Sequence, residues 1–170
     1  MNIVLDIRAK QRLYSENGNR ISFARACLTD GTFANVLFRL QSASSSLHLT
    51  ALAFVFHILN KFFNGCVIGI GTRFEGGLVL IHPVGVVINS AVRGGSNVFI
   101  ESGVVIGDNR GSSPVLGDNV FIGSGAKIIG NVKIGSFTFI GANAVVLKDV
   151  ADGSTAVGVP AKSFPNRSGS

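Results

Sequence analysis

A repeat of six residues is the feature that most constrains what this 170-residue chain can fold into. In steps of six from residue 116, every position holds a branched aliphatic side chain: Leu116, Ile122, Ile128, Ile134, Ile140 and Val146. Four residues after each of the first five stands a small or β-branched one: Val120, Ala126, Val132, Thr138 and Ala144. A period of six is neither the alternation of a half-buried strand nor the period of a helix. It predicts short strands joined by corners, in which three strands close a triangular coil whose aliphatic side chains stack on those of the next coil.

The same repeat predicts the domain organisation. Ile88, Ile100 and Ile106 keep the step among themselves, and Gly94 stands where another aliphatic residue is expected. The step from Ile106 to Leu116 is longer, so the polar stretch "GDNRGSSP" is expected to leave the coil as an external loop over residues 107–114. We therefore expect the coil over residues 66–150 and a C-terminal tail over residues 151–170.

Residues 1–65 follow a different pattern and are expected to be helical. The stretch "TFANVLFRLQSA" places its apolar residues at helical spacing, and "SASSS", residues 42–46, breaks that pattern and is a candidate cap for the next helix. A second helix is expected from Leu47 to Phe63, closed by Asn64 and Gly65. This apolar run contains two histidines, an asparagine and a lysine, so it is expected to pack or to lie at an interface and not to span a membrane. The first 30 residues show no clear pattern.

Charge and cysteine content narrow the partners and the compartment. A net charge of +6 favours an anionic partner, but the basic residues are scattered and not interleaved with aromatic ones, which argues against nucleic acid. Cys27 and Cys66 lack the spacing of a metal site and are expected to be reduced thiols. Asp6 and Arg8 occupy the place where a signal peptide needs an apolar core, so a cytoplasmic location is expected.

Three stretches carry a resemblance to a known family: "GLVLIHPVGVVIN", "VFIGSGAKIIGNVKIGSFTFIGANAVVLKDV" and "STAVGVPAKSF". With the repeat, they make residues 66–163 similar to the hexapeptide-repeat acyltransferases, which fold as a left-handed parallel β-helix. The similar subgroup is that of the serine acetyltransferase-like enzymes, including short members that O-acetylate polysaccharides. The resemblance implies a mainly β fold after a small helical region, acetyl-CoA as co-substrate and a homotrimer. No metal is expected, because zinc enzymes of this fold use three histidines and the coil region of this chain contains one. The helical region would pair two trimers or rest peripherally on a membrane.

His82, inside the apolar run "LVLIHPVGVVIN", matches the general base of this family. Acyl transfer from a thioester to an alcohol requires removal of the hydroxyl proton, and an imidazole titrates near neutral pH. The alternative for His82 is a hydrogen-bonded core histidine. His48 and His57 lie in the apolar helical stretch and are expected to be hydrogen-bonded or to reach the surface there.

Further site residues follow from the resemblance. Ser124 and Ala142 match positions where small residues let the pantetheine arm of the coenzyme approach, between two subunits. Gly158 belongs to a segment, "VGVPAK", that folds over the adenosine end, and Lys162 would meet a phosphate; the alternative is an exposed lysine. Asn89, and Asn109 and Arg110 in the expected external loop, are candidates for contacting the acceptor or the coenzyme. The alternative for the loop residues is a solvated turn.

The chain also departs from the serine enzymes of the family. These carry an Asp before the catalytic His, a second Asp upstream that orients it, and another His further on, where this chain has Ile81, Val67 and Ser113. A small charged acceptor needs charged partners in its site. A sugar or polysaccharide-precursor hydroxyl is therefore the favoured acceptor, with serine O-acetylation in cysteine biosynthesis as the alternative.

Two questions stay open from the sequence. A backbone carbonyl, Glu75 or Glu101 would have to orient His82 in place of the missing Asp. The missing side chains also keep open a β-helix without catalytic activity. A nucleotide-sugar N-acetyltransferase of the same fold would carry other N-terminal recognition elements, which are not seen here.

Overall fold

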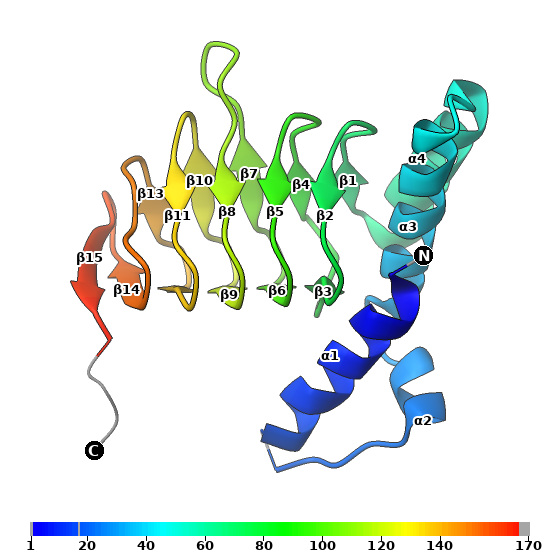
Figure 1. Ribbon diagram of the computed structural model, residues 1–170, viewed down its shortest axis with the longest axis horizontal. Coiled ribbons are helices and arrows are strands. Elements are labelled where there is room, and N and C mark those ends of the chain that lie inside the picture. Colours follow the sequence, from blue (N-terminus) through cyan, green and yellow to red (C-terminus); the bar gives the residue numbers. More distant parts are fainter. Residues whose placement is uncertain (1, 17, 167–170) are drawn as a thin grey trace.

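The computed structural model describes residues 2–16 and 18–166, and it consists of a helical end and a prism of short strands (Figure 1). The helices are α1 (Ile3–Glu16), α2 (Phe23–Cys27), α3 (Thr32–Ser46) and α4 (Thr50–Asn64). They stand at one end of the prism, and the C-terminal strands lie at the opposite end.

The prism has three faces, each a sheet of stacked strands. The first face contains β1 (Val67–Ile68), β4 (Val87–Ile88), β7 (Val105–Gly107), β10 (Lys127–Ile129) and β13 (Val145–Val146). The second contains β2 (Arg73–Phe74), β5 (Arg93–Gly94), β8 (Val115–Leu116) and β11 (Lys133–Ile134). The third contains β3 (Val79–Leu80), β6 (Val98–Ile100), β9 (Val120–Ile122), β12 (Phe139–Ile140), β14 (Ser154–Val157) and β15 (Lys162–Pro165). Pairing is parallel except between β14 and β15, so the predicted mainly β, repeated-coil fold is confirmed.

The inward-facing residues are those that the repeat predicts. All six aliphatic residues from Leu116 to Val146 are at most 3% exposed, and all five companion residues are buried as well. The strand register places them in columns, since Ile106, Ile128 and Val146 are paired partners on the first face. Each coil therefore buries its apolar side chains only against its own corners and the coils next to it.

Gly94 interrupts the aliphatic column because another side chain fills its space. Gly94 pairs with Phe74 of the preceding coil, and a Cβ atom at Gly94 would overlap the Phe74 ring. The large ring of Phe74 is itself buried and packs edge to face on Phe38 of α3, with ring centroids 6.2 Å apart. The missing aliphatic side chain thus reflects a large residue opposite a small one, not a gap in the core.

The external loop leaves the prism between β7 and β8, where Figure 1 shows the chain projecting beyond the other corners. Asn109 and Ser112 close it with two backbone hydrogen bonds of 2.9 and 3.2 Å. The parallel stacking continues past residue 150, because β14 pairs with β12. We therefore propose that the last coil extends to about residue 157 and that the tail begins after it.

The helical boundaries differ from the prediction at two points. The second long helix, α4, begins at Thr50 and not at Leu47, and its N-cap residue, Leu49, forms no side-chain cap. Residues 42–46 do not end the first long helix, because α3 continues to Ser46. The hydroxyl of Ser46 donates to the Ser42 carbonyl (2.9 Å), which satisfies it inside the helix. The chain turns instead at His48, whose φ is +60°. Gly65 closes α4 as predicted, and no helix within the described residues has the length and apolar character needed to cross a bilayer.

Helix side chains satisfy the free edge of the first coil, whose strands have no neighbour on the N-terminal side. The Asn35 amide donates to the Leu78 carbonyl and accepts from the Leu80 N–H (3.0 Å), so it mimics a neighbouring strand for β3. Gln41 donates to the Ile68 carbonyl (3.1 Å) at the edge of β1. Unpaired edge groups would otherwise be buried without partners or would pair with another chain.

A buried ion pair covers the remaining edge. Arg39 of α3 binds both carboxylate oxygens of Asp6 of α1 at 2.8 Å. The same guanidinium donates to the carbonyls of Phe74 (2.7 Å) and Glu75 (2.6 Å), while Asp6 accepts from the Gly77 N–H (2.8 Å). Hydrogen bonds from four of the five guanidinium N–H groups, and to both carboxylate oxygens, join α1, α3 and the first coil in one network.

Replacing Ile122 by Ala is expected to lower the free energy of unfolding by about 2–5 kcal/mol, because the variant leaves a cavity in a column with no exposed atoms. The matched control, Val115→Ala, truncates an outward side chain that is 48% exposed and is expected to cost less than about 0.5 kcal/mol. Urea unfolding at one fixed protein concentration measures both. Equal losses in the two variants would contradict the assignment of inward and outward positions.

Candidate active site

His82 stands at a corner that is wider than its equivalents. The corner between the third and the first face, called the third–first edge below, joins β3 to β4, β6 to β7, β9 to β10 and β12 to β13. Val87 follows Leu80 by seven positions, whereas Val105 follows its equivalent Ile100 by five. Lys127 likewise follows Ile122 by five. The first of these corners therefore holds two additional residues.

The backbone hydrogen bonds identify which residues are additional. Along this edge, Gly103 N–H donates to the Val84 carbonyl (3.0 Å) just as Gly125 N–H donates to that of Ser102 (2.8 Å). Val84 thus takes the regular corner position, and His82 and Pro83 are the extra pair. The side chain of His82 is 55% exposed, whereas both neighbours, Ile81 and Pro83, are buried. The widened corner therefore projects the imidazole from an otherwise closed coil.

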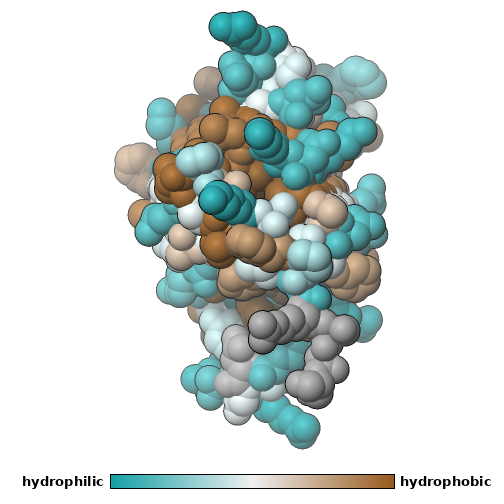
Figure 2. Space-filling view, turned by 90° about the vertical axis from the view of Figure 1, so that its left-hand side faces the viewer, coloured by the Kyte–Doolittle hydropathy of each residue, from teal (hydrophilic) through white to brown (hydrophobic). Residues whose placement is uncertain are grey.

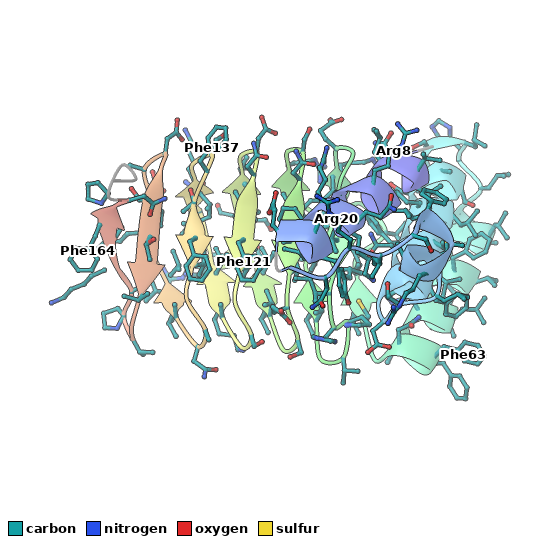
Figure 3. All side chains as sticks on the ribbon, turned by 90° about the horizontal axis from the view of Figure 1, so that it is seen from below. Arg8, Arg20, Phe63, Phe121, Phe137 and Phe164 are labelled. Carbon is teal, nitrogen blue, oxygen red and sulfur yellow. The ribbon has the colours of Figure 1, made fainter. Side chains whose placement is uncertain are left out.

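The imidazole opens onto a pocket of about 410 Å³. Its walls come from the α2–α3 connection, the start of α3, the end of α4 and the widened corner. Phe33 and Phe63 form one apolar wall, with their rings edge to face and 6.2 Å between centroids. Figure 3 shows Phe63 at the outer end of the helical part. The polar groups in the pocket include His82, Asp30 and Asn64.

Asp30 is the functional candidate that sequence reasoning missed. Its Oδ2 lies 3.7 Å from His82 Nδ1, which is an electrostatic contact longer than a direct hydrogen bond. Asp30 precedes α3 in a segment without apolar periodicity, so no pattern in the sequence pointed to it. Glu75 and Glu101, the carboxylates that the sequence offered, form no ion pair with His82 among the residues that the structure describes.

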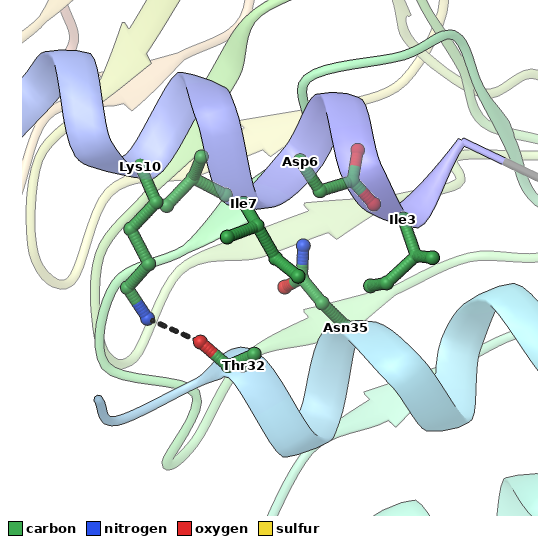
Figure 4. Close-up of a pocket in the computed structure, with 7 residues that line it drawn as sticks. Ile3, Asp6, Ile7, Lys10, Thr32 and Asn35 are labelled. Atoms are coloured by element: carbon green, nitrogen blue, oxygen red, sulfur yellow. Dashed lines mark hydrogen bonds between the residues drawn. The ribbon is translucent and has the colours of Figure 1, made fainter. Parts of the chain in front are cut away.

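The α2–α3 connection that carries Asp30 is tied to α1. Lys10 Nζ donates to the Asp30 backbone carbonyl and to Thr32 Oγ1 (3.1 Å), the second bond being drawn in Figure 4. The enclosed space beside these residues measures about 10 Å³, room for about one water molecule. It is therefore a packing defect and not a ligand site. Burial lowers the pKa of Lys10 to about 8, against the opposing effect of the Asp30 charge.

The predicted coenzyme residues share the third–first edge with His82. Ile122, Ile140 and Ala156 are paired partners on the third face. Ser124, Ala142 and Gly158 each stand two residues further on, and all three are exposed. The coils approach closely here, since a Cβ atom at Gly123 would lie 2.7 Å from the Ala142 nitrogen. Small residues therefore recur along the edge beyond His82, together with the exposed Val84 and Asn143.

Lys162 lies at the C-terminal end of the prism, opposite Val157 in the β14–β15 hairpin, and is exposed. The Gly158 carbonyl accepts from the Val145 N–H (3.0 Å), which fixes the turn of this hairpin to β13. Figure 2 looks onto this end, where hydrophobic surface gathers in the middle with hydrophilic surface around it. Val159 and Phe164, exposed by 72% and 54%, are among the apolar side chains of the hairpin.

Asn89, Asn109 and Arg110 are placed on a different edge, between the first and the second face. Asn89 follows β4, and its side-chain oxygen accepts from the Ser113 hydroxyl (3.1 Å) of the external loop. Asn109 and Arg110 are exposed within that loop. The width of the first face separates all three from His82, so the structure does not bring them together within one chain.

The other histidines have structural positions. His57 Nδ1 lies 2.9 Å from the Ile68 carbonyl and covers the edge of β1, while His48 forms the turn after α3. Within residues 2–16 and 18–166, no three potential metal-ligating side chains gather into a site.

Comparisons with known proteins identify the family of the chain. The family "Bacterial transferase hexapeptide (six repeats)" matches residues 113–148. A serine acetyltransferase of Helicobacter pylori (strain J99) is 38% identical over 141 residues, which cover 81% of this chain and 82% of the relative.

Solved structures extend the similarity to the helical end. The Neisseria gonorrhoeae serine acetyltransferase superposes with a TM-score of 0.87 and 30% identity, covering 96% of this chain but only 64% of that one. A serine acetyltransferase in complex with CoA gives a TM-score of 0.87 at 26% identity, covering 95% of this chain and 68% of that chain. The chain therefore spans about two thirds of the length of these solved relatives.

Raising the pH from about 8 to about 10 is expected to stabilise the wild type relative to Lys10→Met. The pKa of Lys10 is about 8 in the folded state against 10.5 for the ordinary amine, so the unfolded chain binds more protons in this window and stability rises with pH. Urea unfolding along a pH series measures the difference between the two proteins, in which the titration of other groups such as Cys66 cancels. The exposed Lys148→Met is the control and is expected to follow the wild type. A constant difference across the series would contradict a buried amine at this position.

Proposed function

Because the chain belongs to the serine acetyltransferase-like group of the hexapeptide-repeat acyltransferases, we propose that it transfers the acetyl group of acetyl-CoA to the hydroxyl of serine. The observation that carries this proposal is the widened corner. It exposes His82 to a pocket at the start of the edge on which Ser124, Ala142 and Gly158 lie.

The chemistry needs one base and two substrates held together. Nε2 of His82 takes the proton of the acceptor hydroxyl while the hydroxyl oxygen attacks the thioester carbonyl carbon. The carbon–sulfur bond then breaks, the thiolate leaves, and the proton on the imidazole passes to the sulfur, which yields the acetyl ester and the free thiol. No acyl-enzyme is needed when both substrates are bound together.

The coenzyme fits the third–first edge in this proposal. An extended pantetheine arm needs a groove without large side chains, and the exposed positions of this edge include the small residues Ser124, Ala142 and Gly158. The exposed Lys162 at the far end supplies a positive charge for a coenzyme phosphate. The net charge of +6 favours an anionic co-substrate in the same way.

Serine replaces the sugar hydroxyl as the favoured acceptor, because the named relatives are serine acetyltransferases. One observation keeps a glycan hydroxyl as the second candidate. Three positions that carry Asp or His in the serine enzymes are uncharged in this chain, namely Ile81, Val67 and Ser113. Ile81 is also buried.

A homotrimer completes the proposal. The outward side chains of the first face are valines at positions 67, 87, 105 and 145, with Lys127 between the last two. Packing of such faces around a three-fold axis would bring the external loop of one copy, with Asn109 and Arg110, towards His82 of another. The exposed apolar side of α4, which includes Phe54 and Phe62, is our proposed surface for pairing trimers, with peripheral membrane contact as the alternative.

Replacing His82 by Ala is expected to lower the rate of acetyl transfer to serine by about 10²–10⁴-fold, because the hydroxyl proton loses its acceptor. Release of free thiol from acetyl-CoA measures the rate, and calorimetry with CoA is expected to show retained coenzyme binding. The control is His48→Asn, which is expected to leave the transfer rate unchanged. Asparagine tolerates the left-handed backbone conformation of residue 48.

An acceptor screen with serine, free sugars and oligosaccharides separates the remaining possibilities. Thiol release with a sugar and none with serine would transfer the proposal to the glycan hydroxyl. A His82→Ala variant as active as the wild type would remove the general base. If the protein neither binds the coenzyme nor transfers acetyl groups, the remaining alternative is a β-helix without catalytic activity.

A further inference from the structure

We infer that Asp30, presented by the N-terminal helices, is the residue that positions the His82 imidazole. The carboxylate faces Nδ1, so it favours the tautomer that carries its proton on Nδ1 and leaves the lone pair of Nε2 free for the acceptor hydroxyl. This inference rests on the proposed function and names a part of that site. It assigns the role to a different segment of the chain from the upstream position, Val67, at which the serine enzymes carry their Asp.

The loop that carries Asp30 is fitted to the strand that leads to His82. Gly31 has φ of +77°, and a Cβ atom there would overlap the carbonyl oxygen of Leu80. Only a residue without a side chain allows this approach. Because Leu80 ends β3 two positions before His82, the same contact that seats the loop brings Asp30 beside the imidazole.

Two further interactions hold the loop from either side. Asn35, one turn into α3, binds the backbone of Leu78 and Leu80, so the start of α3 is locked to the edge of β3. Lys10 of α1 donates to the Asp30 backbone carbonyl. Asp30 therefore has a fixed backbone, whereas its side chain is 81% exposed and keeps the freedom to rotate towards the ring.

The surroundings leave Asp30 as the one candidate for this role in the described part of the chain. Facing His82 in the pocket are Asp30 from the loop, Phe33 from α3, and Phe63 and Asn64 from α4. Of these, only Asp30 is ionisable. Glu101 follows the paired Ile100 of the next coil and forms no ion pair with His82.

The separation of 3.7 Å is suited to a positioning group before substrate binds. Catalytic hydrogen bonds are often long in the free enzyme and shorten in the complex. A rotation of the exposed Asp30 side chain is enough to bring its oxygen within hydrogen-bond distance of Nδ1–H. The carboxylate then also stabilises the imidazolium that forms when Nε2 accepts the hydroxyl proton.

The test is Asp30→Asn, read by ¹⁵N NMR of the imidazoles and by steady-state kinetics. The chain has three histidines, so His48 and His57 serve as internal references in the same spectrum. At about pH 8, where an ordinary imidazole is mostly neutral, the variant is expected to shift the tautomer of His82 towards Nε2–H. The kcat for acetyl transfer is expected to fall on the order of tenfold, with little change in the KM of the acceptor.

Controls separate positioning from folding and from acceptor binding. Asp30→Glu is expected to restore part of both signals, while Glu16→Gln, an exposed carboxylate at the end of α1, is expected to change neither. An unchanged His82 tautomer in Asp30→Asn would overturn the inference. A raised KM for serine with an unchanged tautomer and kcat would also overturn it and assign Asp30 to the acceptor ammonium. The tautomer measurement needs no acceptor. It therefore tests the Asp30–His82 contact even if the protein does not transfer acetyl groups to serine.

Discussion

The free edge of the first coil is the constraint on which the rest of the structure depends. In the middle coils the strands pair with a strand on each side, but β1, β2 and β3 have no partner strand towards the N-terminus. Asn35, Gln41 and the Arg39–Asp6 pair supply the missing hydrogen bonds from the helices. The helical end is therefore a cap that the prism requires, and its position relative to the coil is set residue by residue.

That constraint connects stability with chemistry, because the widened corner belongs to the coil that is capped. The groups that close the edge of β3 lie within a few residues of Asp30, and β3 itself leads into His82. A histidine in a middle coil would face only other corners. In the first coil it faces helices, which contribute the apolar wall of Phe33 and Phe63 and a carboxylate. The parallel register then extends from this corner along one edge, so a single line of coil positions runs from Val84, beside His82, to Gly158.

The sequence predicted most of the prism and less of the site. The six-residue period identified the buried columns from Leu116 to Val146. Each of these side chains packs on the equivalent side chain of the next coil, so the same residue type recurs at a fixed spacing in the sequence. The two extra residues at the His82 corner also leave a signal in the sequence, because the spacing from Leu80 to Ile88 is longer than that from Ile100 to Ile106. Asp30 could not be found this way, since its place beside His82 depends on Gly31 meeting the Leu80 backbone, a contact across the fold. The prediction that the helix breaks at residues 42–46 was wrong. Serine has a low helix propensity, but α3 continues through this run, where Ser44 is buried, so tertiary packing outweighs the local preference.

A structure determined with bound CoA tests the central claim most directly, namely that the third–first edge starting at His82 is the acyl-transfer site. The account predicts the thiol of the coenzyme beside the His82 imidazole, with the pantetheine arm passing Ser124 and Ala142 and a phosphate near Lys162. Coenzyme bound along either of the other two edges of the prism, away from the His82 corner, would contradict it.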